Sequence, residues 1–174
     1  LGDVYKRQGL SGGYEICKKA LFLLPEDLDG KFTGVSRFWG IDANALKAEL
    51  DVSYRYGTKL EASAKVGYHR WKTADGGETI SYNRPQWEGG ANIRYMPVRP
   101  FVLEAGYEFA AGREYSNLGK LSDIHLVHLK ASYAFTSWFS LYGLTDNVLN
   151  RKYDILYGMP AQGINFMFGV DLKF

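Results

Sequence analysis

The histidines and the single cysteine are the residues of this sequence whose types could carry chemistry. His125 and His128 are three positions apart, and in an extended strand such a pair points to opposite faces, so we do not expect them to share a metal ion. His69 stands alone, and Cys17 allows neither an internal disulfide nor a cysteine-based zinc site. No serine, histidine and aspartate have the context of a nucleophile elbow. We therefore predict no catalytic, cofactor-binding or metal-binding residues and expect a protein that is not an enzyme.

The carboxylates are a second group of candidates. Asp75, Glu78 and Asp123 are expected in loops, where solvated charge is the ordinary state of such residues. Others occupy the polar positions of alternating segments, and a general acid–base pair would need two of them within reach of each other. The sequence does not give the strand registers that would decide this. This second set is Glu49, Asp51, Glu61, Glu104 and Glu108.

The elements that position these residues alternate strictly between apolar and polar side chains, which is the signature of β-strands. Such alternation covers 44–56, 60–71, 87–96, 101–111 and 127–135, is weaker over 139–146 and is cleanest at the end of the chain. Segments 13–22 and 32–39 are expected to be strands with weaker patterning. In the last segment one face carries Ile164, Phe166, Phe168, Val170, Leu172 and Phe174.

Short and long connections alternate along the chain. Tight turns are expected at 57–59, 97–100 and 136–138, and longer loops at 25–31, 73–85, 116–123 and 153–163. Antiparallel outer-membrane barrels have short turns at the periplasmic rim and long loops outside, and strands of about ten residues fit a tilted span. We predict an all-β fold: an antiparallel up-and-down transmembrane β-barrel segment of seven or eight strands from a larger barrel of the 22-stranded class.

Composition is compatible with this fold. Aromatic residues make up 16% of the chain, and apolar runs are too short for a membrane-spanning helix. A soluble up-and-down barrel is the alternative with the same alternation. The charges on the polar face are too numerous for a dry core, and an aromatic group at the short-turn ends resembles a membrane-interface girdle. That group is Tyr54, Tyr56, Phe101, Tyr133, Phe135, Phe139 and Phe174.

Two motifs near the end of the chain narrow the prediction. The segment 146–153, DNVLNRKY, resembles the conserved box before the last strand of TonB-dependent receptors, with Asn147, Leu149, Asn150 and Tyr153 at its matching positions. The following 157–163, YGMPAQG, resembles that family's approach to the last strand, and the hairpin pattern upstream most resembles receptors common in Bacteroidetes. The resemblance implies energy-dependent uptake of a scarce nutrient: a metal chelate, cobalamin or an oligosaccharide.

The last six residues resemble the C-terminal assembly signal of outer-membrane proteins, with Gly169, Leu172 and Phe174 at its matching positions. The resemblance implies recognition of this strand by the barrel-assembly machinery. Met167 departs from the pattern, which usually has a polar residue there.

The same resemblance implies the partners and the location. We expect the outer-membrane bilayer, a nutrient ligand and the TonB complex, reached through a plug region upstream, with the C-terminus periplasmic and the long loops extracellular. Nucleic acid is not expected. Residues 1–8, LGDVYKRQ, resemble the translation of a sequencing adapter, as in metagenomic fragments, so we place the barrel at 9–174. A complete eight-stranded outer-membrane protein with a structural or enzymatic role is the alternative.

Overall fold

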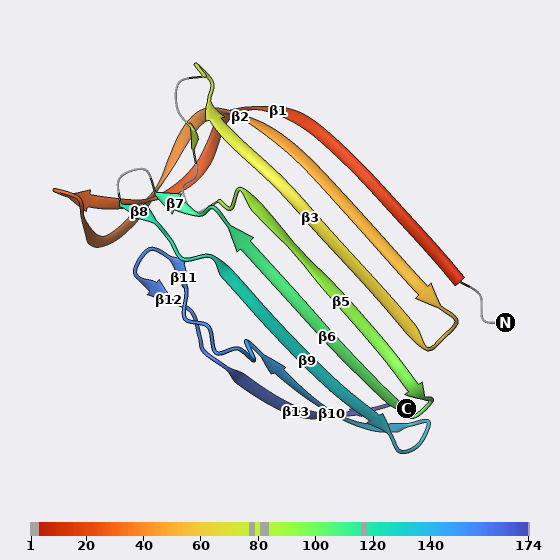
Figure 1. The fold of residues 1–174 in the computed structure, drawn as a ribbon. Helices are drawn as coiled ribbons and strands as arrows, with labels where there is room; N and C mark the ends of the chain where they lie inside the picture. The colour runs from red at the N-terminus through yellow and green to blue at the C-terminus, as the bar shows by residue number, and fades with distance from the viewer. Residues whose placement is uncertain (1–3, 77–78, 81–83, 116–117, 174) are drawn as a thin grey trace.

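The computed structural model describes residues 4–76, 79–80, 84–115 and 118–173. Eight strands form the main antiparallel sheet, and their order across the sheet is the same as their order along the chain (Figure 1). This arrangement confirms the predicted all-β, up-and-down architecture and the predicted number of strands. In spatial order the strands are β1 (Val4–Leu28), β2 (Lys31–Tyr56), β3 (Leu60–Thr73), β5 (Trp87–Val98), β6 (Phe101–Ala111), β9 (Ile124–Ala134), β10 (Phe139–Asp146) and β13 (Asn165–Leu172).

The remaining strands are short and lie in the long connections. β4 (Thr79–Ile80) adds to β3, whereas β7 (Glu114–Tyr115) pairs with β8 (Gly119–Lys120). β11 (Asp154–Leu156) pairs with β12 (Met159–Pro160) in the connection before β13. The three predicted tight turns join β2 to β3, β5 to β6, and β9 to β10, and the long connections follow β3, β6 and β10. The predicted alternation of short and long connections therefore holds from β2 onwards, and only the first connection departs from it.

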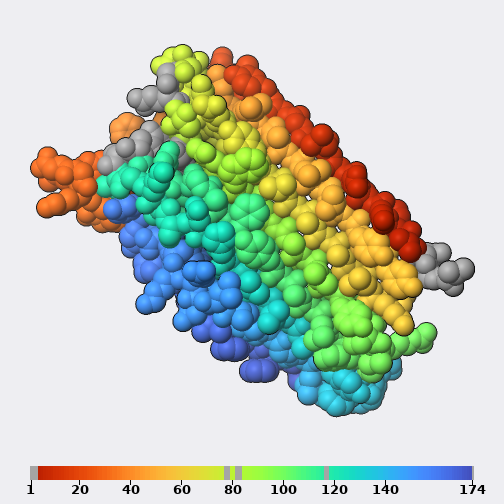
Figure 2. Space-filling view, in the orientation of Figure 1, coloured from red at the N-terminus to blue at the C-terminus, as the bar shows by residue number. Residues whose placement is uncertain are grey.

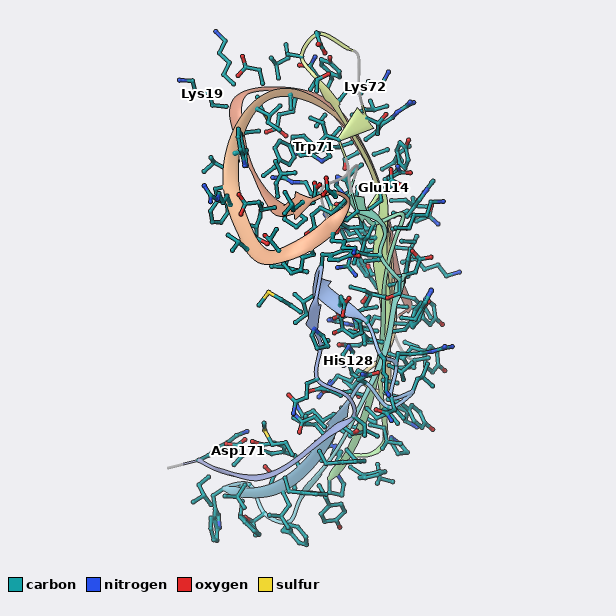
Figure 3. The ribbon with its side chains drawn as sticks, turned by 90° about the vertical axis from the view of Figure 1, so that its left-hand side faces the viewer. Lys19, Trp71, Lys72, Glu114, His128 and Asp171 are labelled. Atoms are coloured by element: carbon teal, nitrogen blue, oxygen red, sulfur yellow. The ribbon has the colours of Figure 1, made fainter. Side chains whose placement is uncertain are left out.

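The sheet is strongly curved, with one concave and one convex face (Figure 3). The view in Figure 2 looks onto the convex face, on which the strands form one continuous surface. Successive side chains of a strand alternate between these faces, so the predicted polar and apolar sets separate onto the concave and convex faces respectively. No helix among the described residues is long and apolar enough to cross a membrane.

The first hairpin differs from its prediction. We expected a loop at 25–31 and separate strands at 32–39 and 44–56, but β1 runs to Leu28 and β2 is one strand of 26 residues. The connection is the two-residue turn Asp29–Gly30, with φ angles of 53° and 73°. Positive φ at both positions is the type I′ turn that joins tightly paired strands, and Asp-Gly favours it. β1 also begins earlier than the predicted strand at 13–22, because residues 4–8 pair with 52–56 of β2.

A small apolar core lies where this hairpin leaves the sheet. Its buried members come from β1, β2, β3 and β4, and Cys17, Ala20 and Ile41 pack against them. Most other large apolar side chains of the described strands are exposed, because a single-layered sheet has no second layer to cover them. The buried residues of this core are Phe22, Ala43, Ala45, Trp71 and Ile80.

Candidate functional site

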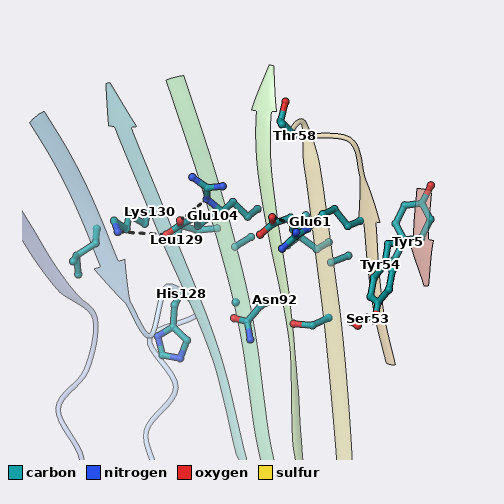
Figure 4. A pocket seen from close by; sticks show the side chains of 18 of the residues that line it. Tyr5, Ser53, Tyr54, Thr58, Glu61, Asn92, Glu104, His128, Leu129 and Lys130 are labelled. Atoms are coloured by element: carbon teal, nitrogen blue, oxygen red, sulfur yellow. Dashed lines mark hydrogen bonds and ion pairs between the residues drawn. The ribbon is translucent and has the colours of Figure 1, made fainter. Parts of the chain in front are cut away.

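A row of alternating charge crosses the concave face. Five residues from five adjacent strands are direct neighbours in the sheet, because Arg55 faces Glu61, Glu61 faces Arg94, Arg94 faces Glu104, and Glu104 faces Lys130. Direct neighbours in a sheet point to the same side, at a spacing that allows their side chains to interact. We call these five residues the charge row; all five line one groove, in which Figure 4 labels Glu61, Glu104 and Lys130.

Ion pairs join the members of the charge row. The Nε–Oε1 distance is 3.0 Å for Arg55 and Glu61, and 3.2 Å for Arg94 and Glu104. The other carboxylate oxygen of Glu104 lies 3.4 Å from Nζ of Lys130. These side chains are partly exposed, and exposed ion pairs contribute only about 0–1 kcal/mol each to stability. The row therefore makes a wet, polar and nearly neutral wall rather than a stabilising core.

A second row runs parallel to the first and consists of small polar residues. Ser53, Ser63 and Asn92 are direct neighbours, and across Gly106 the row continues to His128, which contacts Asp146 of β10. Nδ1 of His128 lies 3.1 Å from Asp146, whereas Nε2 is 3.8 Å from Glu108. Both rows line a groove of about 1070 Å³. Hydroxyl, amide, carboxylate and ammonium groups here can hydrogen-bond a polar ligand or a polar protein segment.

The registers show which residues lie opposite the carboxylates of the concave face. Glu61 and Glu104 each face a cation, and Glu49 pairs with Nζ of Lys65 at 2.8 Å. No two of the described carboxylates predicted for this face stand as direct neighbours across strands. His125 contacts Tyr107 on the convex face while His128 contacts Asp146 on the concave face, as their spacing predicts. Among the described residues, no group of His, Cys, Asp or Glu is arranged to hold a metal ion.

Aromatic rings gather at the short-turn rim, as predicted. Phe101 and Tyr133 have ring centroids 6.5 Å apart, Tyr133 and Phe135 4.8 Å, and Phe135 and Phe139 5.5 Å. Trp138, which was not predicted as part of this group, has its ring 5.9 Å from that of Phe139 at a tilt of 39°. The convex face above these rings is apolar and exposed, with Ile93, Leu103, Leu129, Leu141 and Val170 among its residues.

The predicted box before the last strand forms a closed backbone turn. Asn147 is 4% exposed, and its side-chain amide donates to the carbonyls of Arg151 and Gln162 at 2.9 and 3.3 Å. Its Oδ1 accepts the N–H of Arg151 at 2.9 Å. Asn150 accepts the N–H of Ile164 at 3.2 Å, which ties the turn to the start of β13. Both asparagines have positive φ, of 50° and 47°, which asparagine tolerates better than most residues.

The other two positions of the box behave differently. Leu149 is exposed, whereas Tyr153 lines a second groove on the concave face and its carbonyl accepts the N–H of Ala161 at 2.8 Å. The structure therefore gives the two asparagines a backbone role and places Tyr153 on the concave side. Whether these residues serve the role that the resemblance implies stays a prediction.

The predicted assembly signal occupies the edge strand β13. A Cβ atom at Gly169 would overlap the ring of Tyr142, its direct neighbour on β10, so this glycine makes room for an aromatic ring. Leu172 pairs with Phe139 and is exposed on the sheet edge. Phe174 lies outside the described residues. A recognition role for these three residues also stays a prediction.

A buried arginine joins two long loops, and the sequence analysis missed it. Arg113 is 3% exposed, and its guanidinium donates to the carbonyls of Asp154 and Ile155 at 2.7 and 2.8 Å. Burial lowers the pKa of Arg113 and raises the pKa of the neighbouring Tyr115. The ring of Tyr115 meets that of Tyr157 edge-on at 6.1 Å. No periodic signal marks Arg113, because its partners are backbone carbonyls of a distant loop.

Together, the curved antiparallel sheet, its polar concave wall and its apolar convex surface define a class of fold: part of the wall of an up-and-down β-barrel with a wet interior. Solved structures of receptors and transporters are among those that the chain resembles. Aligned over 100% of this chain, the structure named copper transporter OprC has a TM-score of 0.74 and 17% sequence identity.

Two further solved structures have a similar fold over nearly the whole of this chain. The ferripyoverdine receptor of the outer membrane of Pseudomonas aeruginosa covers 98% of this chain with a TM-score of 0.67 and 15% identity. The ferric-catecholate import receptor Fiu of Escherichia coli K12 covers 97% with a TM-score of 0.70 and 12% identity. The chain spans only 30%, 25% and 25% of these three proteins. No protein-family profile and no curated protein sequence matches it.

Proposed function

We propose that this chain is part of the barrel wall of a TonB-dependent receptor, which takes up a scarce nutrient across the outer membrane of a Gram-negative cell. The observation that carries the proposal is the polarity of the two faces. The convex face is apolar and exposed on residues such as Leu103 and Leu129, whereas the concave face carries the ion-paired charge row. A barrel with lipid outside and water or a polar segment inside has this distribution.

In this proposal each surface has its own partner. The convex face contacts the bilayer, with the ring cluster around Tyr133 and Phe135 at the periplasmic interface. The short turns are periplasmic and the hairpins β7–β8 and β11–β12 extracellular. The concave wall contacts the nutrient and a polar plug contributed by another part of the receptor, through which the TonB complex acts. The barrel-assembly machinery reads β13, including Gly169, Leu172 and Phe174, and we assign no enzymatic role.

The nutrient class follows from the resemblance to the family and comprises metal chelates, cobalamin and oligosaccharides. A complete eight-stranded barrel is less well supported, because β1 and β13 lie at opposite ends of the sheet and do not pair with each other among the described residues. A barrel in lipid must close its ladder of hydrogen bonds, so further strands are required beside both edges.

Uptake assays test the proposal. Cells carrying the gene and cells lacking it would be compared for accumulation of a radiolabelled ferric siderophore, cyanocobalamin and a maltooligosaccharide, with and without a protonophore. We expect one probe to accumulate only with the gene and only while the proton gradient is intact. Accumulation that is insensitive to the protonophore, or recovery of the protein in the soluble fraction, would contradict the proposal.

A further inference from the structure

The cations of the two faces of the sheet differ in their pairing. Arg70 and Lys72 of β3 are direct neighbours of Leu46 and Asn44, and they alternate with Trp71, so they lie on the convex face. Neither forms an ion pair with a described carboxylate. The convex face thus carries two neighbouring positive charges without a counterion. Five cations of the concave face, in contrast, are ion-paired with carboxylates: Lys47, Arg55, Lys65, Arg94 and Lys130.

The distribution of carboxylates explains this difference. Outside the hairpin tip at 18–42, the carboxylates at directly paired positions of the described sheet all lie on the concave face. Asp42 stands at the β-bulge between Cys17 and Ala20, and its Oδ1 accepts the backbone N–H of Lys19 at 2.7 Å. The concave set is Glu15, Glu49, Asp51, Glu61, Glu88, Glu104, Glu108, Asp146 and Asp171.

Aromatic rings lie beside the two cations on the convex face, towards the middle of the strands. Tyr68 and Trp87 are direct neighbours with ring centroids 4.8 Å apart, and Trp87 is 48% exposed. On β6, Tyr107 stacks with Phe109 at 6.2 Å. Tyrosine and tryptophan favour the level of lipid headgroups. These rings form a second aromatic belt, nearer the long connections than the one around Tyr133.

The height of the two cations matches the edge of a bilayer's apolar layer. Arg70 and Lys72 follow Leu60, the first residue of β3, by ten and twelve positions. A strand rises about 3.3 Å per residue and barrel strands tilt by about 40°, which puts the cations about 25 and 30 Å above Leu60. The outward apolar band of such barrels is about 25 Å tall. Both cations therefore stand where headgroups begin.

Arg70 and Lys72 can converge on one anion. They are two positions apart on one face, with about 7 Å between their Cα atoms. A guanidinium matches two phosphate oxygens with paired N–H donors, and an ammonium adds a compact charge. Asn44, the direct neighbour of Lys72, brings a side-chain amide to the same patch. The anion that a bilayer offers at this depth is the phosphate of a headgroup.

We propose that Arg70 and Lys72, assisted by the amide of Asn44, bind the phosphate of a lipid headgroup at the convex face. That this face meets a bilayer rests on the proposed function; the phosphate site is an addition to it. The bound headgroup supplies the negative charge that the convex face lacks. Its acyl chains then lie against the rings of Tyr68 and Trp87.

Native mass spectrometry of the full protein in detergent tests the site. The probes are dipalmitoyl phosphatidic acid and dipalmitoylglycerol, which differ only by the phosphate. The unaltered protein should bind phosphatidic acid more tightly. Arg70→Gln combined with Lys72→Gln should weaken that binding about five- to thirtyfold, because one cation near a phosphate-bearing surface contributes a factor of about five. Binding of dipalmitoylglycerol should not change, which would show that the apolar surface is intact.

A matched pair of substitutions controls for the loss of charge. Lys31→Gln combined with Lys120→Gln removes two exposed cations from the long connections and should leave the affinity for phosphatidic acid unchanged. Equal weakening in both double variants, or equal binding of the two lipids, overturns the site. Displacement of phosphatidic acid by an equal concentration of inorganic phosphate overturns its assignment to a lipid.

Cell fractionation judges the proposed function separately. Recovery of the protein in the soluble fraction would contradict the proposed function, whereas the detergent assay reports on the phosphate site alone. Loss of the phosphate preference in a protein that fractionates with the outer membrane would contradict only the site.

Discussion

The guanidinium of Arg113 donates a 2.7 Å hydrogen bond to the carbonyl oxygen of Asp154, 41 residues further along the chain. Together with the bond to Ile155, this contact makes one unit of the β7–β8 and β11–β12 hairpins. The strands of these hairpins are only two or three residues long, and such hairpins could not hold a fixed position alone. The buried Arg113 is therefore one of the contacts that hold this rim, beside the edge-on Tyr115–Tyr157 pair.

Replacing Arg113 should loosen both hairpins while leaving the sheet intact. For Arg113→Ala we expect a loss of about 2–3 kcal/mol in local opening free energy, because hydrogen bonds from a charged donor are lost and carbonyls are left unpaired. Hydrogen exchange should show faster exchange at 118–123 and 153–161. Arg151→Ala, an exposed arginine of the same loop, is the control. Unchanged protection in Arg113→Ala would show that the hairpins are held by other contacts.

Alkaline pH should release the same rim through Tyr115. Burial raises the pKa of this phenol above its ordinary value. The folded loop thus favours the neutral form, and its contribution to stability is complete below a pH of about 10, the unfolded pKa, and is lost as pH rises through the raised value. Exchange at 153–161 followed from pH 8 to 11 should therefore accelerate beyond its intrinsic pH dependence. Tyr115→Phe should abolish that excess, and its persistence would assign the effect to another group.

Asn147 should matter for its backbone conformation as well as for its amide. Asn147→Gly keeps the left-handed conformation but loses three hydrogen bonds, which should cost about 2–3 kcal/mol of unfolding free energy. Asn147→Ala should cost about 1 kcal/mol more, because alanine is strained at this φ. Urea unfolding in lipid vesicles would measure both, with the exposed Leu149→Ala as control. Equal values for Gly and Ala would refute the conformational part of this account.

Gly169 offers a way to separate packing from recognition by the assembly machinery. Gly169→Ala should cost about 1–3 kcal/mol, because the added methyl group displaces the Tyr142 ring. Combined with Tyr142→Ala, the same change should cost little beyond Tyr142→Ala alone. Unfolding in vesicles reports packing, and the yield in outer membranes reports assembly. If the double variant regains stability in vesicles but still fails to assemble in cells, Gly169 is read by the machinery as well.

The sequence allowed the faces of the sheet to be predicted but not the contacts across it. Alternation of side chains is a local property, so the concave position of Glu104 and the convex position of Leu103 could be inferred from neighbours within one strand. The charge row depends on the registers of five strands. Alternation cannot predict these registers, because shifting a strand by two residues leaves every side chain on the same face. Asp-Gly is a dipeptide that favours a two-residue turn, whereas we predicted a longer loop over 25–31.

The rim could not be predicted for a different reason. Arg113 donates to the backbone carbonyl of Asp154, 41 residues away. Phe32 contacts the ring of Tyr157 from the β1–β2 hairpin, whose register shifts at a bulge between Cys17 and Ala20. Neither contact leaves a pattern in the residue types. The two asparagines of the box were singled out by resemblance alone, and their positive φ angles give a physical reason for asparagine at both positions.

The central claim is that the convex face meets lipid and the concave face meets water or a polar segment. Leu129 and Lys130 are adjacent on β9 and point to opposite faces, so one pair of spin labels tests it directly. In the full protein with Cys17→Ser, reconstituted in vesicles, a label at Leu129→Cys should be accessible to oxygen, which concentrates in lipid. A label at Lys130→Cys should be shielded from lipid-borne oxygen. Equal accessibility of both labels to a water-soluble nickel complex, or the reversed pattern, would contradict the account.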